Sequence, residues 1–187
     1  MKKTLYAIWE IVEVFLIAII AVAAIKYFLI QPFIVNGASM EPNFSDGNYL
    51  LVDEISYRLS QPERGDVIVF KAPTNPAVYY IKRVIGLPGE KIEINTDSVV
   101  ITNGKHPNGF TLQEPYLENA LKSNPFGNIV MTLKDNEYFV MGDNRSNSLD
   151  SRRWGPLVRN DIVGVVRARL WPVSQFSFFS NVSYATN

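Results

Sequence analysis

The most restrictive feature of the chain is an apolar run near its N-terminus. Residues Leu5 to Ile30 form 26 positions interrupted only by Glu10, Glu13 and Lys26, and the stretch Val14–Ile25 contains no charge. At 1.5 Å per residue, a helix over this run is roughly 39 Å long, which exceeds the roughly 30 Å hydrocarbon core of a bilayer. The run therefore predicts a transmembrane helix over residues 5–30.

The flanking charges predict the orientation of that helix. Lys2 and Lys3 precede it, and positive charge is enriched on the cytoplasmic side of membrane spans. We expect a single-pass protein of the cell membrane, with residues 1–4 in the cytoplasm and an extracytoplasmic domain over residues 31–187. Two alternatives stay open: a cleaved signal peptide, because small residues lie at 21–24, and a buried helix of a soluble protein. Apolar residues continue past the alanines and no polar face interrupts Val14–Ile25, so the sequence favours a retained anchor.

Composition excludes several kinds of site. Eighteen basic and eighteen acidic residues cancel, which leaves no net positive charge for binding nucleic acid. The chain has no cysteine, which excludes disulfides and thiolate zinc sites. Its single histidine, His106, leaves no Ser-His-Asp triad and no histidine-based metal site. We therefore expect no metal, no cofactor and no nucleic-acid partner.

From Phe33 onward, short β-rich runs alternate with turn residues. This spacing favours an all-β sandwich or a coiled, barrel-like sheet over alternating βα units, so we expect a mainly β domain behind the helix. Ser56–Gln61 and Asp150–Trp154 are expected as short helical turns, and residues 103–128 as an irregular surface insertion. The predicted strands are Tyr49–Asp53, Asp66–Lys71, Tyr79–Gly86, Lys91–Asn95, Val99–Thr102, Ile129–Leu133, Tyr138–Met141 and Ile162–Trp171.

A serine and a lysine can supply the chemistry that cysteine and paired histidines cannot. Ser39 lies in the segment Gly37–Pro42, and Lys82 interrupts the apolar run Tyr79–Ile85. A serine hydroxyl becomes a useful nucleophile when a neighbouring base accepts its proton, and burial lowers a lysine pKa from its usual value of about 10.4. Two alternatives stay open from the residues alone. Ser39 could be a turn hydroxyl, and Lys82-Arg83 could mark a solvent-exposed edge strand.

Four sequence blocks together resemble the type I signal peptidases, peptidase family S26, in the short single-anchor form typical of Gram-positive bacteria. They occur in the family's order behind an N-terminal apolar segment, and the resemblance runs from that segment through Trp171. The blocks are Gly37-Ala38-Ser39-Met40-Glu41-Pro42, Arg64-Gly65-Asp66-Val67-Ile68-Val69-Phe70, Tyr80-Ile81-Lys82-Arg83-Val84-Ile85-Gly86-Leu87-Pro88-Gly89-Glu90 and Gly142-Asp143-Asn144-Arg145-Ser146-Asn147-Ser148-Leu149-Asp150-Ser151-Arg152-Arg153-Trp154-Gly155.

The resemblance implies a membrane-bound serine endopeptidase that removes signal peptides from exported preproteins after small residues, at Ala-x-Ala sites. It implies that Ser39 attacks the scissile carbonyl, that Lys82 acts as general base and then as general acid, and that Ser148 orients the lysine. It also implies a mostly β catalytic domain that rests on the outer surface of the lipid bilayer. Four polar residues match the family's structural positions around the site: Asp143, Arg145, Asp150 and Arg152.

The chain departs from part of the family at the position two residues before Ser39. Some members carry a serine hydroxyl there as a second oxyanion donor, whereas this chain has Gly37. We therefore expect the backbone N–H groups of Ser39 and Gly37 to serve as donors. An extended substrate is expected to add as a strand along the edge near Ile81–Val84. The predicted walls of the substrate pocket are Phe33, Val35, Met40, Tyr80 and Ile81.

Two other functions stay open. One is a self-cleaving serine–lysine regulator, although such proteins carry a DNA-binding head and this chain has an apolar N-terminal segment and no net charge. The other is a catalytically idle, membrane-anchored module that binds exported peptides.

Overall fold

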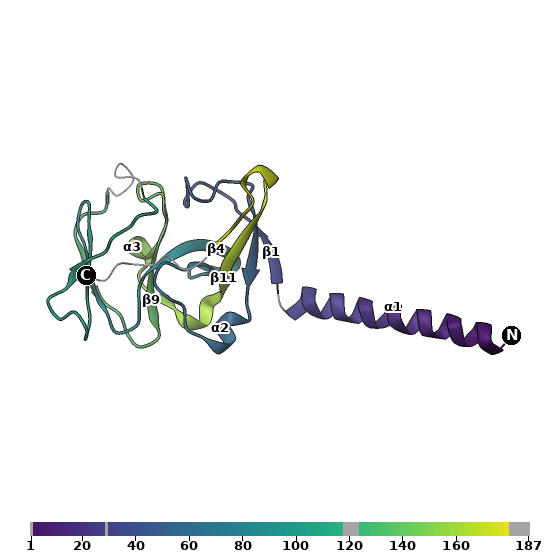
Figure 1. Cartoon of the computed structure of the whole chain (residues 1–187). Helices are drawn as coiled ribbons and strands as arrows, with labels where there is room; N and C mark the ends of the chain where they lie inside the picture. Colours follow the sequence, from purple (N-terminus) through teal and green to yellow (C-terminus); the bar gives the residue numbers. More distant parts are fainter. Residues whose placement is uncertain (1, 29, 118–123, 180–187) are drawn as a thin grey trace.

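The structure of this chain is a computed structural model that describes residues 2–28, 30–117 and 124–179; along the first helix it describes the side chains of Tyr6 and residues 8–20 only. A long helix, α1 (Lys2–Phe28), leads into a domain built from two antiparallel sheets (Figure 1). The prediction of a mainly β domain is confirmed.

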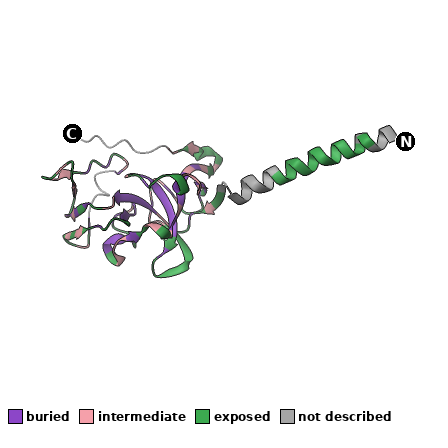
Figure 2. Ribbon diagram, turned by 90° about the horizontal axis from the view of Figure 1, so that it is seen from below, coloured by how far each residue is buried: buried purple, intermediate pink, exposed green. Residues whose placement is uncertain are grey.

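The helix α1 projects from the β domain in both ribbon views (Figures 1 and 2), and each side chain described along it is exposed. Within the residues that the structure describes, no helix has the length and hydropathy required of a membrane span. The helix also ends earlier than the predicted span 5–30, because Ile30 belongs to the strand β1 (Ile30–Ile34). Pro32 explains this boundary, since a proline favours extended backbone in the residue before it.

The remaining elements are short helices and strands. The helical turns are α2 (Ser56–Leu59), α3 (Ser151–Trp154), η2 (Arg159–Asp161) and η3 (Val173–Gln175). The strands after β1 are β2 (Tyr49–Asp53), β3 (Val67–Ala72), β4 (Asn75–Gly86), β5 (Lys91–Ile94), β6 (Val99–Thr102), β7 (Phe110–Thr111), β8 (Ile129–Thr132), β9 (Glu137–Met141), β10 (Leu157–Val158), β11 (Ile162–Trp171) and β12 (Ser177–Phe178).

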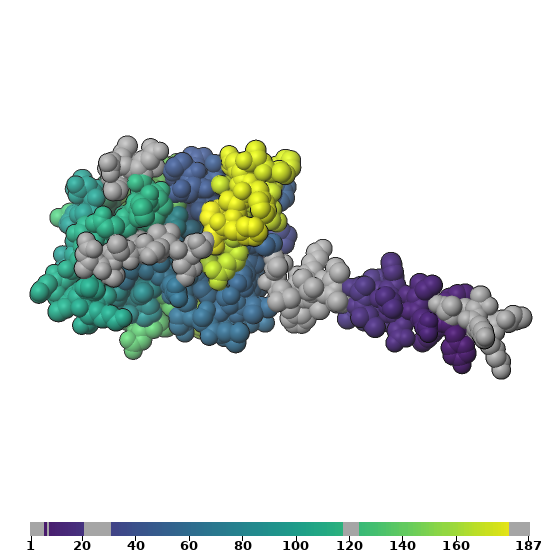
Figure 3. Space-filling view, viewed as in Figure 1, coloured from purple at the N-terminus to yellow at the C-terminus, as the bar shows by residue number. Residues whose placement is uncertain are grey.

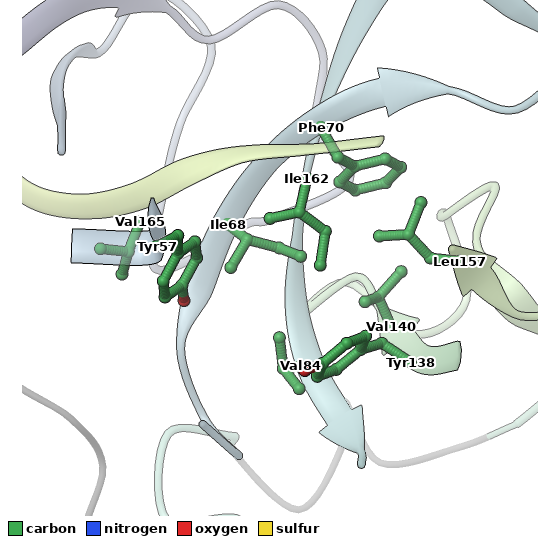
Figure 4. Packing of buried hydrophobic residues seen from close by; sticks show 9 residues of the cluster. All are labelled: Tyr57, Ile68, Phe70, Val84, Tyr138, Val140, Leu157, Ile162 and Val165. Carbon is green, nitrogen blue, oxygen red and sulfur yellow. The ribbon is translucent and has the colours of Figure 1, made fainter. Parts of the chain in front are cut away.

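The larger sheet has the strand order β1-β2-β11-β3-β4-β9-β10, with β12 paired to β11. It coils, because the ring of Phe33 on β1 lies 5.5 Å from the ring of Tyr79 on β4 although three strands separate them in the sheet. One face of the coil is filled by a buried apolar cluster (Figure 4). Its members are Tyr57, Ile68, Phe70, Val84, Tyr138, Val140, Leu157, Ile162 and Val165.

The smaller sheet has the order β7-β6-β5-β8 and a separate apolar cluster. Residues of β4 and β9, two strands of the larger sheet, contribute to this cluster. The smaller sheet therefore packs its apolar side chains against these two strands. The cluster comprises Ile85, Ile92, Ile94, Val99, Ile101, Leu112, Leu133, Phe139 and Met141.

Each of the eight predicted strands corresponds to a strand of the structure. The sequence did not predict β1, which begins at the last residue of the run assigned to the helix, Ile30, and extends beyond it. It also did not predict β7, β10 and β12, which have two residues each. Two residues are too few to establish an alternating apolar pattern.

Candidate active site

Ser39 lies in a turn after β1 that backbone hydrogen bonds fix in place. The Val35 N–H donates to the Asn48 carbonyl at 2.9 Å, and the Gly47 N–H donates to the Val35 carbonyl at 2.9 Å. Gly37 has a φ of +94°, a conformation that residues with a Cβ rarely adopt. The turn therefore requires glycine at this position, and it holds a half-buried Ser39 beside β4.

Lys82 lies on β4, between β3 and β9 in the larger sheet. It is 3% exposed, and its Nζ lies 2.7 Å from Ser39 Oγ and 2.8 Å from the Ile81 carbonyl oxygen. The alternative of a solvent-exposed edge strand at Lys82-Arg83 is therefore wrong. The fold brings together the two residues that the sequence singled out, although 43 positions separate them.

The environment of Lys82 is apolar but not free of charge. Burial lowers the pKa of Lys82 from its ordinary value to about 8. The negative charges of Asp150 and Asp143 act in the opposite direction, and the positive charge of Arg152 adds to the lowering. A lysine with this pKa exists partly as a neutral amine at neutral pH, which is the form that accepts a proton.

The loop 142–152 is held by a fully buried ion pair. Arg152 donates from Nε and Nη2 to the two carboxylate oxygens of Asp150 at 2.8 Å each. Asp150 also accepts the Gly142 N–H at 2.9 Å. Burial alone would raise the pKa of Asp150, but these bonds, the charge of Arg152 and the nearby Ser148 hydroxyl lower it below its ordinary value. Asp150 is therefore ionised and ties the two ends of the loop together.

Asp143 and Asn144 connect this loop to the strand and the turn that carry the Ser39–Lys82 pair. Arg83 donates from Nε and Nη2 to the carboxylate of Asp143, at 2.9 and 2.6 Å. Asn144 donates its backbone N–H to the Ser39 carbonyl and its side-chain amide to the Ala38 carbonyl, both at 3.1 Å. The contribution of Asn144 was not predicted, although it lies within a quoted sequence block.

Arg145 is 2% exposed and points to a partner that the sequence did not suggest. It donates to both carboxylate oxygens of Glu114, in the predicted surface insertion, and to the Gly142 carbonyl at 3.1 Å. Burial alone would lower the pKa of Arg145, but the bonds and charge of Glu114 raise it. Glu114 could not be recognised from its own neighbours in the sequence, because its partner is 31 positions away.

Gly142 marks a close approach between the loop and the Ser39 turn. A Cβ at this position would lie less than 3.0 Å from both the Ser39 carbonyl oxygen and Ser148 Oγ. Ser148 is therefore near the Ser39 turn, as expected of a residue that acts on the pair. The Ser148 hydroxyl is buried, and no atom of the described residues lies in a position to form a hydrogen bond of good geometry with it.

A pocket of about 210 Å³ opens beside the Ser39–Lys82 pair. Four of the five predicted wall residues line it: Phe33, Val35, Tyr80 and Ile81. The prediction for Met40 is wrong, because Met40 is 0% exposed and packs in the core with other buried side chains rather than against the pocket. The sequence did not single out five further apolar lining residues: Ile34, Leu50, Val69, Tyr79 and Leu149.

The edge available to an extended peptide begins earlier on β4 than predicted. The strand β9 pairs with β4 from Arg83 onward, and Val84 also makes backbone hydrogen bonds with Gly65 and Asp66, so Arg83 and Val84 are covered on both sides. Tyr79 to Lys82 pair with β3 on one side, and no described strand pairs with them on the other. The expected edge near Ile81–Val84 is thus corrected to Tyr79–Lys82.

The two expected oxyanion donors differ in their hydrogen bonding. The Gly37 N–H donates to the carboxylate of Asp46 at 2.7 Å, so this group is already engaged and is not a free donor. The Ser39 N–H has no hydrogen-bond partner within the described part of the chain. The expectation for Gly37 is therefore corrected, since a carboxylate competes for its single donor.

His106 lies apart from this site, and the described residues contain no group of side chains suited to hold a metal ion. His106 packs against Phe110 beside a hollow that Arg64 and Glu90 also line. Over residues 2–28, 30–117 and 124–179, no three side chains of His, Asp or Glu gather as metal ligands would.

Comparisons with known proteins agree with the motif order. The family model "Signal peptidase, peptidase S26" matches residues 8–171. Signal peptidase IB of Staphylococcus aureus (strain MRSA252) is 34% identical over 91% of this chain and 93% of that protein. Signal peptidase I of Bacillus amyloliquefaciens is 35% identical over 91% of this chain and 89% of that protein.

One solved structure, a signal peptidase I from Enterococcus faecalis V583, matches with a TM-score of 0.48 and 34% identity over 57% of this chain and 97% of that chain. The family model and the two sequence relatives each extend over most of the chain. By these sequence matches, this chain belongs to the signal peptidase family, peptidase S26, and is a serine endopeptidase.

Proposed function

We propose that this protein removes N-terminal signal peptides from exported preproteins, with Ser39 as nucleophile and Lys82 as general base. The observation that carries the proposal is the distance of 2.7 Å between Lys82 Nζ and Ser39 Oγ, in a site where Lys82 is almost completely buried. The names of the sequence relatives, signal peptidases I and IB, support the choice of substrate.

The catalytic sequence follows from this contact. The neutral Lys82 amine accepts the Ser39 proton as Oγ bonds to the scissile carbonyl carbon, and the resulting ammonium then donates that proton to the leaving amine. In the second half, water attacks the acyl-serine while Lys82 accepts its proton, and Ser39 regains a proton on release. The Ser39 N–H is the donor proposed for the oxyanion. The buried Ser148 hydroxyl has no hydrogen-bond partner of good geometry among the described residues, and we propose that it accepts a hydrogen bond from the Lys82 amine.

The proposed cleavage after small residues, at Ala-x-Ala sites, is supported by the lining of the pocket. The bulky rings of Phe33 and Tyr80 line it together with Ser39, and they limit the room beside the nucleophile. The peptide backbone is proposed to pair with the free edge at Tyr79–Lys82, which would bring the scissile carbonyl to Ser39.

We propose that the chain spans the cell membrane once through the helix α1, within residues 5–28, with residues 1–4 in the cytoplasm and the β domain outside. Exposed apolar side chains along a helix that projects from the domain support this topology (Figures 1 and 2). A helix of this kind is stable only when a bilayer or a protein partner covers it.

The β domain is proposed to rest on the same bilayer. Ile34, Tyr49 and Trp171 are exposed and adjacent across β1, β2 and β11, so they form an apolar row. Phe176 and Phe178 are exposed as well, on the C-terminal segment that lies at the surface of the domain (yellow in Figure 3). Aromatic side chains favour the membrane interface, which supports this orientation.

The test is cleavage of a purified preprotein with an Ala-x-Ala site by the full chain in liposomes, with Ser39→Ala and Lys82→Ala side by side. We expect cleavage by the wild type and near-complete loss in both variants. Equal cleavage by wild type and variants would overturn the dyad. Binding without cleavage by a folded wild type would favour the idle peptide-binding module. Cleavage of the chain itself with an intact preprotein would favour the self-cleaving regulator.

A further inference from the structure

Three segments meet at the active site: the turn after Ser39, the strand around Lys82, and the loop 142–152. The short segment Glu114-Pro115-Tyr116, from the insertion after β7, contacts each of them. We infer that Glu114 and Tyr116 are positioning residues, which hold the three segments in the arrangement that the proposed Ser39–Lys82 chemistry requires. The inference rests on that proposed function.

Glu114 holds the loop 142–152. It is 5% exposed and accepts hydrogen bonds from both Nη atoms of Arg145, whose Nε donates to the Gly142 carbonyl at 3.1 Å. The planar guanidinium therefore links the Glu114 carboxylate to the backbone of Gly142 in a fixed geometry. Because Gly142 lies tightly against the Ser39 carbonyl, a displacement of Arg145 would be transmitted to the nucleophile turn.

Tyr116 holds the other two segments. Its hydroxyl donates to Glu114 at 2.6 Å, and its ring lies 3.9 Å from the guanidinium carbon of Arg83, the neighbour of Lys82 on β4. Its carbonyl accepts the side-chain amide of Asn43 at 3.0 Å, and the same amide donates to Asp143 at 2.9 Å. Tyr116 is thus joined to the strand of Lys82 and to the segment that follows Ser39.

The expected consequence of loosening this segment is a change in the surroundings of Lys82. The charged groups that act on Lys82 are Asp150, Asp143 and Arg152, and all lie on the loop that Glu114 holds through Arg145. A looser loop admits water, which weakens the desolvation that lowers the pKa of Lys82. A looser loop also lets the distance between Ser39 Oγ and Lys82 Nζ vary and become longer on average. This slows the chemical step more than it weakens substrate binding.

Glu114→Gln and Tyr116→Phe in the full chain test the inference. Glu114→Gln removes the charge opposite Arg145, and Tyr116→Phe removes one hydroxyl while keeping the ring over Arg83. We expect kcat to fall about tenfold to a hundredfold in Glu114→Gln with KM within about twofold, and a smaller fall in the same sense for Tyr116→Phe. The acid limb of the pH profile of kcat/KM should move to higher pH in both variants.

Glu90→Gln is the matched control. Glu90 forms a buried ion pair with Arg64 at 2.6 Å, and this pair lines the hollow next to His106 rather than the pocket of Ser39. Glu90→Gln removes the same charge from the same kind of buried pair as Glu114→Gln does, so the two variants should lower the melting temperature by comparable amounts. Below the melting temperature, the kcat and pH profile of Glu90→Gln should match the wild type. If Glu114→Gln behaves like Glu90→Gln, Glu114 has a structural role only and the inference fails.

A second measurement does not depend on cleavage. The pKa of Lys82 can be followed by the chemical shift of its labelled Cε in wild type and Glu114→Gln, with Lys82→Met to assign the signal. A rise in the pKa in Glu114→Gln supports the inference, and an unchanged pKa overturns it. Failure of the proposed function would appear differently, as a wild type that does not cut while the titration still responds to Glu114.

Discussion

The carboxylate of Asp150 opposes the effect that burial has on Lys82. Desolvation lowers the pKa of Lys82, the charges of Asp150 and Asp143 oppose this and that of Arg152 adds to it, so that the net value is about 8. The loop that supports the site therefore limits how far the lysine pKa falls. The site holds an amine that changes its protonation state close to neutral pH.

The first prediction is the pH dependence of cleavage. Only neutral Lys82 can accept the Ser39 proton, so kcat/KM should rise as the pH increases and level off above about 8. The measurement is the initial rate of preprotein cleavage from pH 5.5 to 10, with substrate below KM. A profile that is flat across pH 7 to 9 would contradict the assignment of Lys82 as base.

The second prediction concerns stability rather than activity. In the unfolded chain Lys82 keeps its ordinary pKa, so between pH of about 8 and 10.5 the unfolded state binds a proton that the folded state does not. The stability contributed through Lys82 therefore rises with pH over this window. Below it, the folded state retains a buried ammonium at a cost on the order of 3 kcal/mol.

Lys82→Met should accordingly be more stable than the wild type at pH 7, and the difference should shrink towards pH 10.5. Urea unfolding at both pH values measures this, with Lys91→Met as the control, because Lys91 is exposed and pairs with Glu93 at the surface. A difference that is the same at both pH values would show that packing, not charge, separates Lys82→Met from the wild type.

The third prediction is that Gly142 tolerates no side chain. Gly142→Ala places a Cβ less than 3.0 Å from the Ser39 carbonyl and from Ser148 Oγ, so the loop or the nucleophile turn must move. A misplacement of about 1 Å costs about a hundredfold in rate, and we expect a loss of that size in kcat. The control is Gly104→Ala, because Gly104 has no neighbouring atom within 4 Å of a Cβ and no positive φ. Comparable rates for Gly142→Ala and wild type would contradict the close approach.

The sequence predicted the parts of the fold that local patterns determine. The strand of Lys82 and its neighbours follow from apolar runs bounded by turns, and the Ser39–Lys82 pair follows from the order of the motif blocks. Met40 shows the limit of such reasoning. Its place in a motif suggested a pocket wall, but a motif position does not determine which side of a turn an apolar side chain faces.

The parts that could not be predicted depend on contacts between distant segments. The carboxylate of Asp46 accepts a hydrogen bond from the Gly37 N–H, so this N–H is no longer free to bind the oxyanion. The contact exists because the turn brings residues 37 and 46 together, which the residue types alone do not indicate. Glu114 lies in a segment with several turn-forming residues and no periodic pattern, so composition indicated a surface insertion. Its buried carboxylate is paired with Arg145, which is 31 positions away on the loop after β9.

The fourth prediction is that the buried pair of Asp150 and Arg152 is required for folding as well as for the site. Asp150→Asn leaves the Arg152 guanidinium, whose side chain is 0% exposed, without its counter-charge. Breaking a buried pair in this way costs about 3–5 kcal/mol, whereas the same change in an exposed pair costs about 0–1 kcal/mol. Glu93→Gln provides that comparison, because Glu93 and Lys91 pair at the surface. Urea unfolding at pH 7 measures both, and equal losses of stability would show that the Asp150–Arg152 pair is not the anchor of the loop 142–152.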